Sequence, residues 1–272
     1  MFILINIPFF CLETKKIQKF KFNFYFLYLK MKIISLVPSI TEAILDLGFP
    51  ESDLIGRTKF CIHPKEKIKN IEIIGGTKNL NINKIKSLNP DLIIANKEEN
   101  VKDQVEELMN DFRVLVTNVE TVEDNYYLLK NLGNVLDKEE MAQNFNLKIY
   151  EILEKFKLPK KLKTAYLIWK NPYMTIGSDT FIHHILNEFG FENLFKNEKR
   201  YPQIEVSDLE NADVIMLSSE PFPFKEKHVE ELKTVFPNKK IMVVDGEAFS
   251  WYGTHLAKCE EYFQELIENI QS

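Results

Sequence analysis

The chain has 272 residues, of which 45% are hydrophobic and 28% are charged, and its formal net charge is −5 at pH 7. This composition is typical of a globular protein with one large domain or two smaller ones. Its mild acidity weighs against a nucleic-acid groove. Five His and three Cys are few, and Cys61 and Cys259 lie far apart. Neither a disulfide framework nor a zinc-type cysteine pair is indicated.

The first thirty residues differ from the rest, being rich in Phe, Ile, Lys and Asn. Their start carries no basic residue and the apolar run ends at Phe10, which does not fit a secretory signal. A membrane helix needs a long uninterrupted apolar span, and lysines at positions 15, 16, 19 and 21 interrupt any candidate. We expect translation to start at Met31, with residues 1–30 a mis-assigned extension. A degenerate export or anchor segment is the alternative.

A regular alternation of strands and helices begins at Met31. Apolar runs typical of strands occur at 32–37, 71–74, 91–95 and 113–117, and helical patterns lie between them at 38–48, 81–88 and 100–111. Ser39 and Glu42 have the spacing of a capping box at the start of the first helix, and Gly48 ends it. Such alternation predicts a mostly parallel sheet covered by helices.

The alternation stops after residue 117, where two helical patterns follow each other. The second, at 137–156, contains no Gly or Pro. As a helix it would span roughly 30 Å, so it could connect two lobes. Strand patterns then return at 163–169, 213–219 and 239–244, with helical patterns at 179–190, at 226–236 and at the C-terminus.

A weak sequence similarity between residues 87–98 and 208–220 favours two lobes of similar architecture. We therefore predict an α/β protein with two Rossmann-like lobes and parallel sheets. It would be divided into an N-terminal lobe at 31–135, one long backbone helix at 136–158 and a C-terminal lobe at 159–272.

Large aromatic residues follow several strands, at the sheet edge where α/β proteins bind ligands. The stretch DGEAFSWYG, residues 245–253, places Trp251 and Tyr252 after a strand, although loops are usually polar. Trp169 and Phe222 follow two other strands. An aromatic rim with a few polar groups suits a pocket for a bulky ligand. Packing of both tryptophans in the core is the alternative.

No pattern of catalytic or metal-binding residues stands out. The glycines at 75–76 lack the GxGxxG spacing and indicate a tight turn. His63, two residues after Cys61, could bind a metal, but an ordinary loop position explains it better. The histidines at 183–184 fit helix packing, and the glutamates at 98–99 fit a solvated face or a helix start better than a catalytic pair. There is no nucleophile elbow or triad-type sequence.

Several stretches resemble one transport family. They are ISLVPSITEAILDLG, LIGRTKFCIHP, GGTKNLNINKIKSLNPDLIIA, MTIGSDTFIHHILNEFGFENLF and RYPQIEVSDLENADVIML. From about Met31 to the C-terminal helix, the chain is similar to the helical-backbone (class III) substrate-binding proteins of ABC importers for cobalamin and iron siderophores. The SLxPSxTE opening and the LxPDLII segment are fairly specific for this family. The resemblance implies a protein that binds a chelate between its lobes for an ABC-transporter permease, without catalysis and without an intrinsic cofactor.

The resemblance also implies which residues line the cleft. Carried over by position, the ligand-binding residues are Phe60, Thr77, Trp169, Tyr173, Tyr201, Phe222, Trp251 and Tyr252. Corrinoids are large and flat-faced, so aromatic contacts suit them. Siderophore binders often use arginines for anionic ligands, and only Arg57 and Arg200 lie near the expected cleft loops. A cobalamin-like corrinoid is therefore the favoured ligand, with a ferric siderophore as the alternative.

The family docks on its permease through one acidic residue in each lobe, a kind of contact that orients association. Glu205 fits this role in the second lobe, whereas Asn83 stands at the corresponding position of the first, where Glu72 could substitute. The resemblance implies a monomer that is periplasmic or associated with the membrane. Because no familiar export signal is present, a cytoplasmic chelate-handling protein without a permease is the alternative.

Two other classes of function remain open. An enzyme on the same scaffold, such as a metal-dependent hydrolase or a nitrogenase-like relative, would need converging ligands that the few His and Cys do not supply. A protein that binds free metal ions could use His63, His183, His228 or His255, although their separation in the sequence does not resemble a ligand set.

Overall fold

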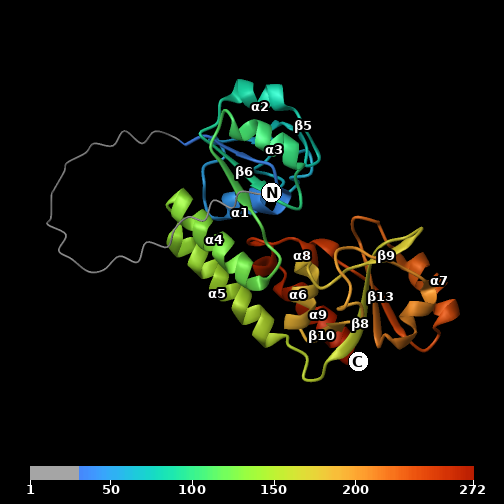
Figure 1. Cartoon of the computed structure of the whole chain (residues 1–272). Coiled ribbons are helices and arrows are strands. Elements are labelled where there is room, and N and C mark those ends of the chain that lie inside the picture. The colour runs from blue at the N-terminus through green and yellow to red at the C-terminus, as the bar shows by residue number, and fades with distance from the viewer. Residues whose placement is uncertain (1–30) are drawn as a thin grey trace. The chain divides into compact units, whose positions relative to one another are not determined.

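The computed structural model describes residues 31–272, which form one compact unit (Figure 1). The expectations for residues 1–30, including a start at Met31, lie outside the described residues. Two β-sheets follow each other along the chain. A pair of helices separates them in sequence.

The first sheet is parallel throughout and has the strand order β3–β2–β1–β6–β7. Its strands are β1 (Ile33–Ser35), β2 (Leu54–Arg57), β3 (Glu72–Ile73), β6 (Leu92–Asn96) and β7 (Val114–Thr117). The helices of this region are α1 (Pro38–Asp46), α2 (Ile82–Leu88) and α3 (Lys102–Met109). Because all the pairs are parallel, the loops at the carboxyl ends of the strands share one edge of the sheet.

Two short strands beside this sheet, β4 (Gly75–Gly76) and β5 (Asn79–Leu80), form a separate antiparallel ladder. Gly75 has a φ of +114°, and a Cβ on it would lie 2.4 Å from the carbonyl oxygen of Asn79. Only glycine fits this backbone. The tight turn predicted at 75–76 is therefore the start of a hairpin, and this hairpin carries Thr77 and Lys78.

The second sheet is mixed, with the order β11–β9–β8–β12–β13 and with β10 also paired to β8. Its strands are β8 (Leu162–Trp169), β9 (Tyr173–Thr175), β10 (Phe191–Asn193), β11 (Gln203–Ile204), β12 (Val214–Ser218) and β13 (Lys240–Val244). Strands β8, β12 and β13 pair in parallel, as predicted, and β10, which was not predicted, also pairs in parallel with β8. Strand β9 pairs antiparallel with both β8 and β11. The helical segments of this region are α6 (Phe181–Glu188), η1 (Val206–Asn211), α7 (Glu226–Val235), α8 (Gly246–Ser250), η2 (His255–Lys258) and α9 (Glu260–Gln271).

Between the sheets, α4 (Val122–Leu136) and α5 (Glu139–Lys155) lie side by side as a helical hairpin (Figure 1). Asp137, with a φ of 60°, ends α4, so the helix predicted over 136–158 starts only at Glu139 and is shorter than expected. The α4–α5 pair is close-packed, because a Cβ on Gly133 would lie 2.8 Å from the Cβ of Ala142. The boundaries proposed for the two lobes stay a prediction.

The two faces of the second sheet pack into different hydrophobic cores, because successive side chains of a strand point to opposite faces. Tyr166 and Met216 point into a large cluster of buried side chains that also includes Ile33 of the first sheet. Their neighbours Leu167 and Ile215 point into a smaller cluster on the opposite face. This is the period-two alternation of a strand that is buried on both faces. The larger core thus runs from the first sheet to the second.

Candidate ligand-binding site

Two buried asparagines shape the turn after β6. Asn96 accepts hydrogen bonds from the backbone N–H groups of Glu98 and Glu99, at 2.8 and 3.2 Å. The amide of Asn100 donates to the carbonyl oxygens of Leu36 and Thr77, both at 3.1 Å. The turn, the loop after β1 and the β4–β5 hairpin are therefore held together. The sequence analysis did not assign this role to either asparagine.

The carboxylate of Glu98 joins this turn to a segment of the second half of the chain. Arg200 donates to Glu98 Oε1 at 3.0 Å, and the hydroxyl of Tyr201 donates to the same oxygen. On the other side, Lys78 Nζ donates to the backbone oxygen of Glu98 at 2.5 Å. Burial and the charge of Glu98 raise the pKa of Tyr201, which keeps its hydroxyl protonated. Tyr201, one of the predicted ligand residues, thus lies where the two halves meet.

A second contact of this kind links His63, after β2, to Glu247 of α8, with 2.9 Å between Nε2 and Oε2. The ring of His63 also packs edge-on against Trp251, with 5.3 Å between the centroids. The stretch 245–253 is therefore not an open loop. Asp245 caps α8 by accepting from the N–H of Glu247 at 3.0 Å, and Trp251 is packed down with only 8% of its surface exposed.

Tyr252 is buried as well, and its ring packs edge-on against Phe181. Burial and the charges of Glu99 and Glu98 raise its pKa well above the usual value, an effect that nearby Ser39 partly offsets. Tyr252 therefore stands close to the acidic turn after β6. Its part in binding a ligand stays a prediction.

The remaining predicted residues form two further aromatic groups. Trp169 is 40% exposed and packs edge-on against Phe222, at 5.8 Å between centroids, while Tyr173 lies half-buried in the same cluster. Phe60 is half-exposed, and Lys59 Nζ lies 5.0 Å from its ring centroid. The structure thus brings Trp169, Phe222 and Tyr173 together and leaves Trp169 and Phe60 with the most accessible rings.

Two partly buried glutamates, Glu99 after β6 and Glu220 after β12, have raised pKa values. Burial raises the pKa of Glu99, and the charges of Glu98 and Glu220 raise it further against the pull of Lys78. Burial also raises the pKa of Glu220, together with the charges of Glu247 and Asp245, although Ser250 donates to Glu220 Oε1 at 2.9 Å. Carboxylates from both halves of the chain therefore interact here.

A separate set of contacts joins α1 to η2. Glu42, with 3% of its side chain exposed, accepts from His255 Nδ1 at 2.8 Å and from Lys258. Asp46 accepts from Lys258 Nζ at 2.7 Å and from the hydroxyl of Thr254 at 2.6 Å. Burial alone would lower the pKa of His255, but hydrogen bonds with Cys259 and Glu42 and the charge of Glu42 raise it to about 10. Burial opposes ionisation of Glu42, yet these cations lower its pKa.

Asn125 of α4 adds two buried hydrogen bonds to this set. Its amide donates to the carbonyl oxygen of Gly253 at 3.2 Å and accepts from the N–H of Gly253 at 2.5 Å. Gly253 has a φ of +88°, and a Cβ on it would lie 3.1 Å from the Cβ of Ala43. The glycine that closes the stretch 245–253 is therefore required by both its backbone conformation and its contacts.

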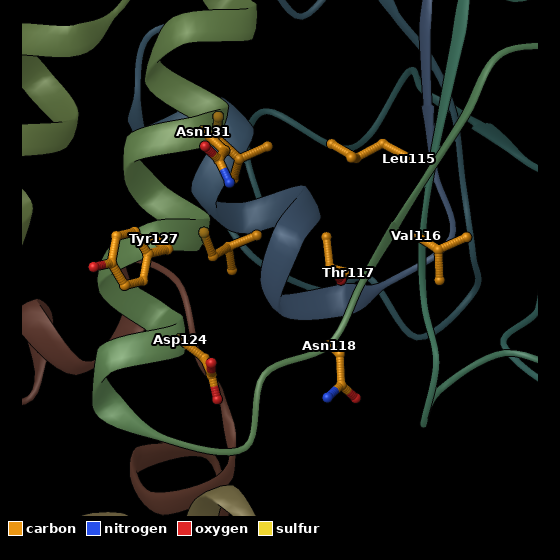
Figure 2. A pocket seen from close by; sticks show the side chains of 9 residues that line it. Leu115, Val116, Thr117, Asn118, Asp124, Tyr127 and Asn131 are labelled. Carbon is orange, nitrogen blue, oxygen red and sulfur yellow. The ribbon is translucent and has the colours of Figure 1, made fainter. Parts of the chain in front are cut away.

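A cavity of about 200 Å³ lies between β7 and α4 (Figure 2). Asp124, Tyr127 and Asn131 line it from the helix, and Leu115 and Thr117 line it from the strand. None of the predicted ligand residues contributes to this cavity. Within residues 31–272, no group of three or more His, Cys, Asp or Glu side chains is arranged to hold a metal ion.

The residues considered for permease docking are mostly exposed. Glu205 precedes η1, where its N–H donates to Asp208 at 2.8 Å. Asn83 lies on α2, while Glu72 pairs with Lys84 Nζ at 2.6 Å. Their roles in docking stay a prediction.

A family model described as periplasmic binding protein matches residues 33–234. The vitamin B12-binding protein of Vibrio campbellii is 24% identical over 184 residues, which cover 65% of this chain and 66% of that protein. An ABC transporter substrate-binding lipoprotein of Bacillus subtilis is 28% identical over 185 residues, covering 64% of this chain and 58% of that protein. The matched part thus spans about two thirds or less of these two relatives.

Solved structures share the fold. The vitamin B12-binding protein BtuF of Vibrio cholerae superimposes with a TM-score of 0.74 at 18% identity, covering 89% of this chain and 98% of that one. The heme-binding protein HutB of the same species gives a TM-score of 0.74 at 20% identity, covering 88% and 99%.

The chain belongs to the periplasmic binding protein family, and its fold is that of BtuF-type binding proteins. The resemblance found in the sequence is thereby confirmed. Among the described residues, none of the helices has the length and apolar character needed to cross a membrane.

Proposed function

We propose that this protein captures a metal chelate, first of all a cobalamin-like corrinoid, between the loops of its two sheets and presents it to an ABC-transporter permease. The observation that carries this proposal is the meeting of loops from both halves at the Glu98–Tyr201 and His63–Glu247 contacts. Ligands of α/β proteins bind at such strand ends. The family match supports a binder, and the names of relatives that bind vitamin B12 favour a corrinoid.

The aromatic residues support a flat, bulky ligand. Trp169 and Phe60 offer exposed rings, and Trp251 lies directly behind the His63–Glu247 contact. Ring faces and edges of this kind suit a large planar chelate. Opening of the His63–Glu247 contact would bring Trp251 within reach of the ligand.

Permease docking is the second part of the proposal. Glu205 is exposed and makes no salt bridge within residues 31–272, so it is available to an arginine of a partner. Glu72 is the acidic candidate near Asn83 in the first half, although Lys84 holds it in an exposed ion pair. Rim charges of this sort orient encounter more than they add affinity.

Titration calorimetry of the full chain with cyanocobalamin tests the ligand assignment, with a ferric siderophore as the comparison. We expect saturable one-to-one binding of cyanocobalamin that weakens at least about tenfold in Trp169→Ala, because a stacking surface is lost. Tyr150→Ala, which removes a 65% exposed ring from α5, is the matched control and should bind like the wild type. Saturable binding of the siderophore alone would replace cobalamin as the assigned ligand. If neither compound binds, the assignment is refuted.

A further inference from the structure

Strand β7 forms one edge of the first sheet, because the strand order ends with its pairing to β6. The carbonyl oxygens of Arg113 and Thr117 accept, both at 2.9 Å, from backbone N–H groups on the β6 side. Successive residues of a strand turn their backbone groups to opposite sides. The N–H and C=O groups of Val114 and Val116 therefore face away from β6, towards the open edge.

The residues of β7 do not block this edge. Natural sheets protect their edges with lysine, proline, bulges or very short strands. Strand β7 has four residues, Val-Leu-Val-Thr, and pairs with β6 without a register shift. The opposite edge strand, β3, has only two residues, and its Glu72 forms an ion pair with Lys84. Of the two edges of this sheet, β7 thus offers the longer row of backbone groups for another strand.

The cavity of about 200 Å³ lies between this edge strand and α4. Leu115 and Thr117 turn towards α4 and line the cavity, whereas Val116 turns away (Figure 2). Tyr127, which also lines it, is 49% exposed, so the cavity opens to solvent. Pockets for small-molecule ligands usually measure roughly 300–1,000 Å³, and this smaller cavity suits a single side chain. On a strand added to β7, every second side chain would point to the face of Leu115 and Thr117, and so into the cavity.

Asp124 is the charged residue among those that line the cavity, and its carboxylate points into it (Figure 2). Its Oδ2 accepts from the N–H and the hydroxyl of Thr121, at 2.9 and 2.8 Å, and from the N–H of Glu120 at 3.1 Å. These hydrogen bonds fix the carboxylate in place. Neither Lys nor Arg lines the cavity, and Asp124 forms no salt bridge within residues 31–272. A fixed carboxylate without a cation suits the ammonium or guanidinium group of a ligand.

We propose that the edge of β7 binds an extended segment of a partner protein as an added strand, and that a lysine or arginine side chain of this segment enters the cavity and pairs with Asp124. Backbone hydrogen bonds to Val114 and Val116 supply affinity, and the cavity selects the basic residue, which is the usual division of roles when a peptide adds to a sheet edge. None of the predicted chelate-binding residues lines the cavity. The proposal therefore goes beyond the proposed function and does not depend on it.

A short peptide tests the proposal by NMR on the full chain labelled with ¹⁵N. The probe is acetyl-Thr-Val-Lys-Val-Thr-amide, which as a strand places its lysine and threonines on one face. We expect saturable shifts of the amide signals of Val114 and Val116, with slowed hydrogen exchange at these two residues. Leu115 and Thr117 turn their N–H groups towards β6 and should keep their exchange rates. Absence of shifts in β7, or equal slowing at all four residues, would overturn the proposal.

Two altered peptides separate strand addition from simple attraction of charge. Norleucine in place of lysine removes the ammonium group and should weaken binding on the order of tenfold, because a charge-assisted hydrogen bond is lost. A fully N-methylated peptide keeps the charge but cannot donate from its backbone, so it should not bind. Binding of the methylated peptide with unchanged affinity would show that the edge of β7 is not used.

Variants of the chain assign the two parts of the site. Asp124→Asn keeps an oxygen for the hydrogen bonds from Thr121 and should make the lysine and norleucine peptides bind equally. Glu140→Gln is the matched control, because it removes an exposed charge from the first turn of α5, and it should leave the ratio of the two affinities unchanged. The same ratio in the Asp124→Asn variant and in the wild type would contradict the role of Asp124.

The edge itself is tested at Val116. Val116→Pro removes an outward N–H and leaves the hydrogen bonds to β6 in place, so it should abolish binding, whereas Val116→Thr should bind like the wild type. Equal binding by these two variants would contradict strand addition. Light scattering on the wild type distinguishes a partner segment from a second copy of this chain. We expect a monomer, and a dimer that Val116→Pro converts to a monomer would place a second copy at the edge and overturn the proposal.

Discussion

Two sets of contacts join the first half of the chain to the second, and they differ in burial. At the carboxyl ends of the strands, the contacts run through partly exposed side chains: Glu98 is 31% exposed, His63 27% and Glu247 23%. Between α1, α4 and the segment 253–258, they run through Glu42, which is 3% exposed, and Asn125, which is 1% exposed. Contacts that water can replace open easily, whereas buried polar groups must keep their partners. The second set therefore holds the halves together, and the first set is free to rearrange around a ligand.

Removal of the buried carboxylate of Glu42 should cause the largest loss of stability among the variants that test this comparison. Glu42→Ala leaves His255 and Lys258 without their shared partner. The free energy of unfolding should fall by about 3–5 kcal/mol, because a charge is left uncompensated in a buried site. Urea unfolding measures the change. Glu260→Ala, which removes the exposed partner of Lys155, is the control and should alter stability little. A loss in Glu42→Ala no larger than in the control would contradict the holding role.

The asparagine of α4 tests the same region without a change of charge. Asn125→Ala leaves the buried N–H and C=O of Gly253 unpaired. An unsatisfied buried group lowers the free energy of unfolding by about 1–3 kcal/mol, and we expect a loss in that range. Asn146→Ala on α5 removes one exposed hydrogen bond to the backbone of Tyr126 and serves as the control. Both variants should keep the secondary structure seen by circular dichroism, so that the comparison reports the contact alone.

The free energy of unfolding should depend on pH through the ionisation of His255. Its pKa is raised in the folded chain to about 10 from an ordinary value of 6.5. The folded state therefore keeps a proton that the unfolded state releases, and this stabilisation is complete below about pH 6.5 and lost as the pH rises towards 10. Between pH 7 and 9, the free energy of unfolding should fall by at most about 1.4 kcal/mol per pH unit. His255→Asn should flatten this slope, and an unchanged slope in the variant would assign it to other groups.

The smallest effect on stability is expected at the carboxyl-end contacts. Tyr201→Phe removes one hydroxyl bond to a partly exposed carboxylate. Its stability should stay within about 1 kcal/mol of the wild type. Its affinity for cyanocobalamin should nevertheless change, because Tyr201 lies at the proposed ligand site. Parallel unfolding and calorimetry on one preparation measure both quantities. A large loss of stability with unchanged affinity would show instead that the contacts at the carboxyl ends of the strands hold the two halves together.

Much of the fold was predictable because its main strands have clear patterns. The runs that become β6, β8 and β12 are apolar at most positions, as expected for strands buried on both faces. Strands β9 and β11 have three and two residues, and so short a run has no pattern of its own. They exist because β9 folds back on β8 and β11 pairs with β9.

The candidate site was predictable only in its residue types. Aromatic residues after strands indicated a pocket, and the resemblance supplied positions such as Tyr201 and Trp251. What sequence could not show is which side chains meet, since the pairs that join the halves are far apart: Glu98 and Tyr201 by 103 positions, His63 and Glu247 by 184. For the same reason Glu98 and Glu99 were interpreted as a solvated face or a helix start, whereas the first binds across the halves and the second is partly buried.

The two tryptophans sit in contrasting surroundings, and this gives the protein an optical readout of its own. Trp169 is 40% exposed beside Phe222, whereas Trp251 is 8% exposed between His63 and His255. An indole in water emits at longer wavelength than an indole in an apolar setting, so the fluorescence spectrum should be the sum of two overlapping bands, one from each tryptophan. A chelate that absorbs visible light would quench the red-shifted band when it covers Trp169, and would quench the blue-shifted band only once His63 has swung away from Trp251. The order in which the two bands dim would then record the sequence of events as a ligand enters.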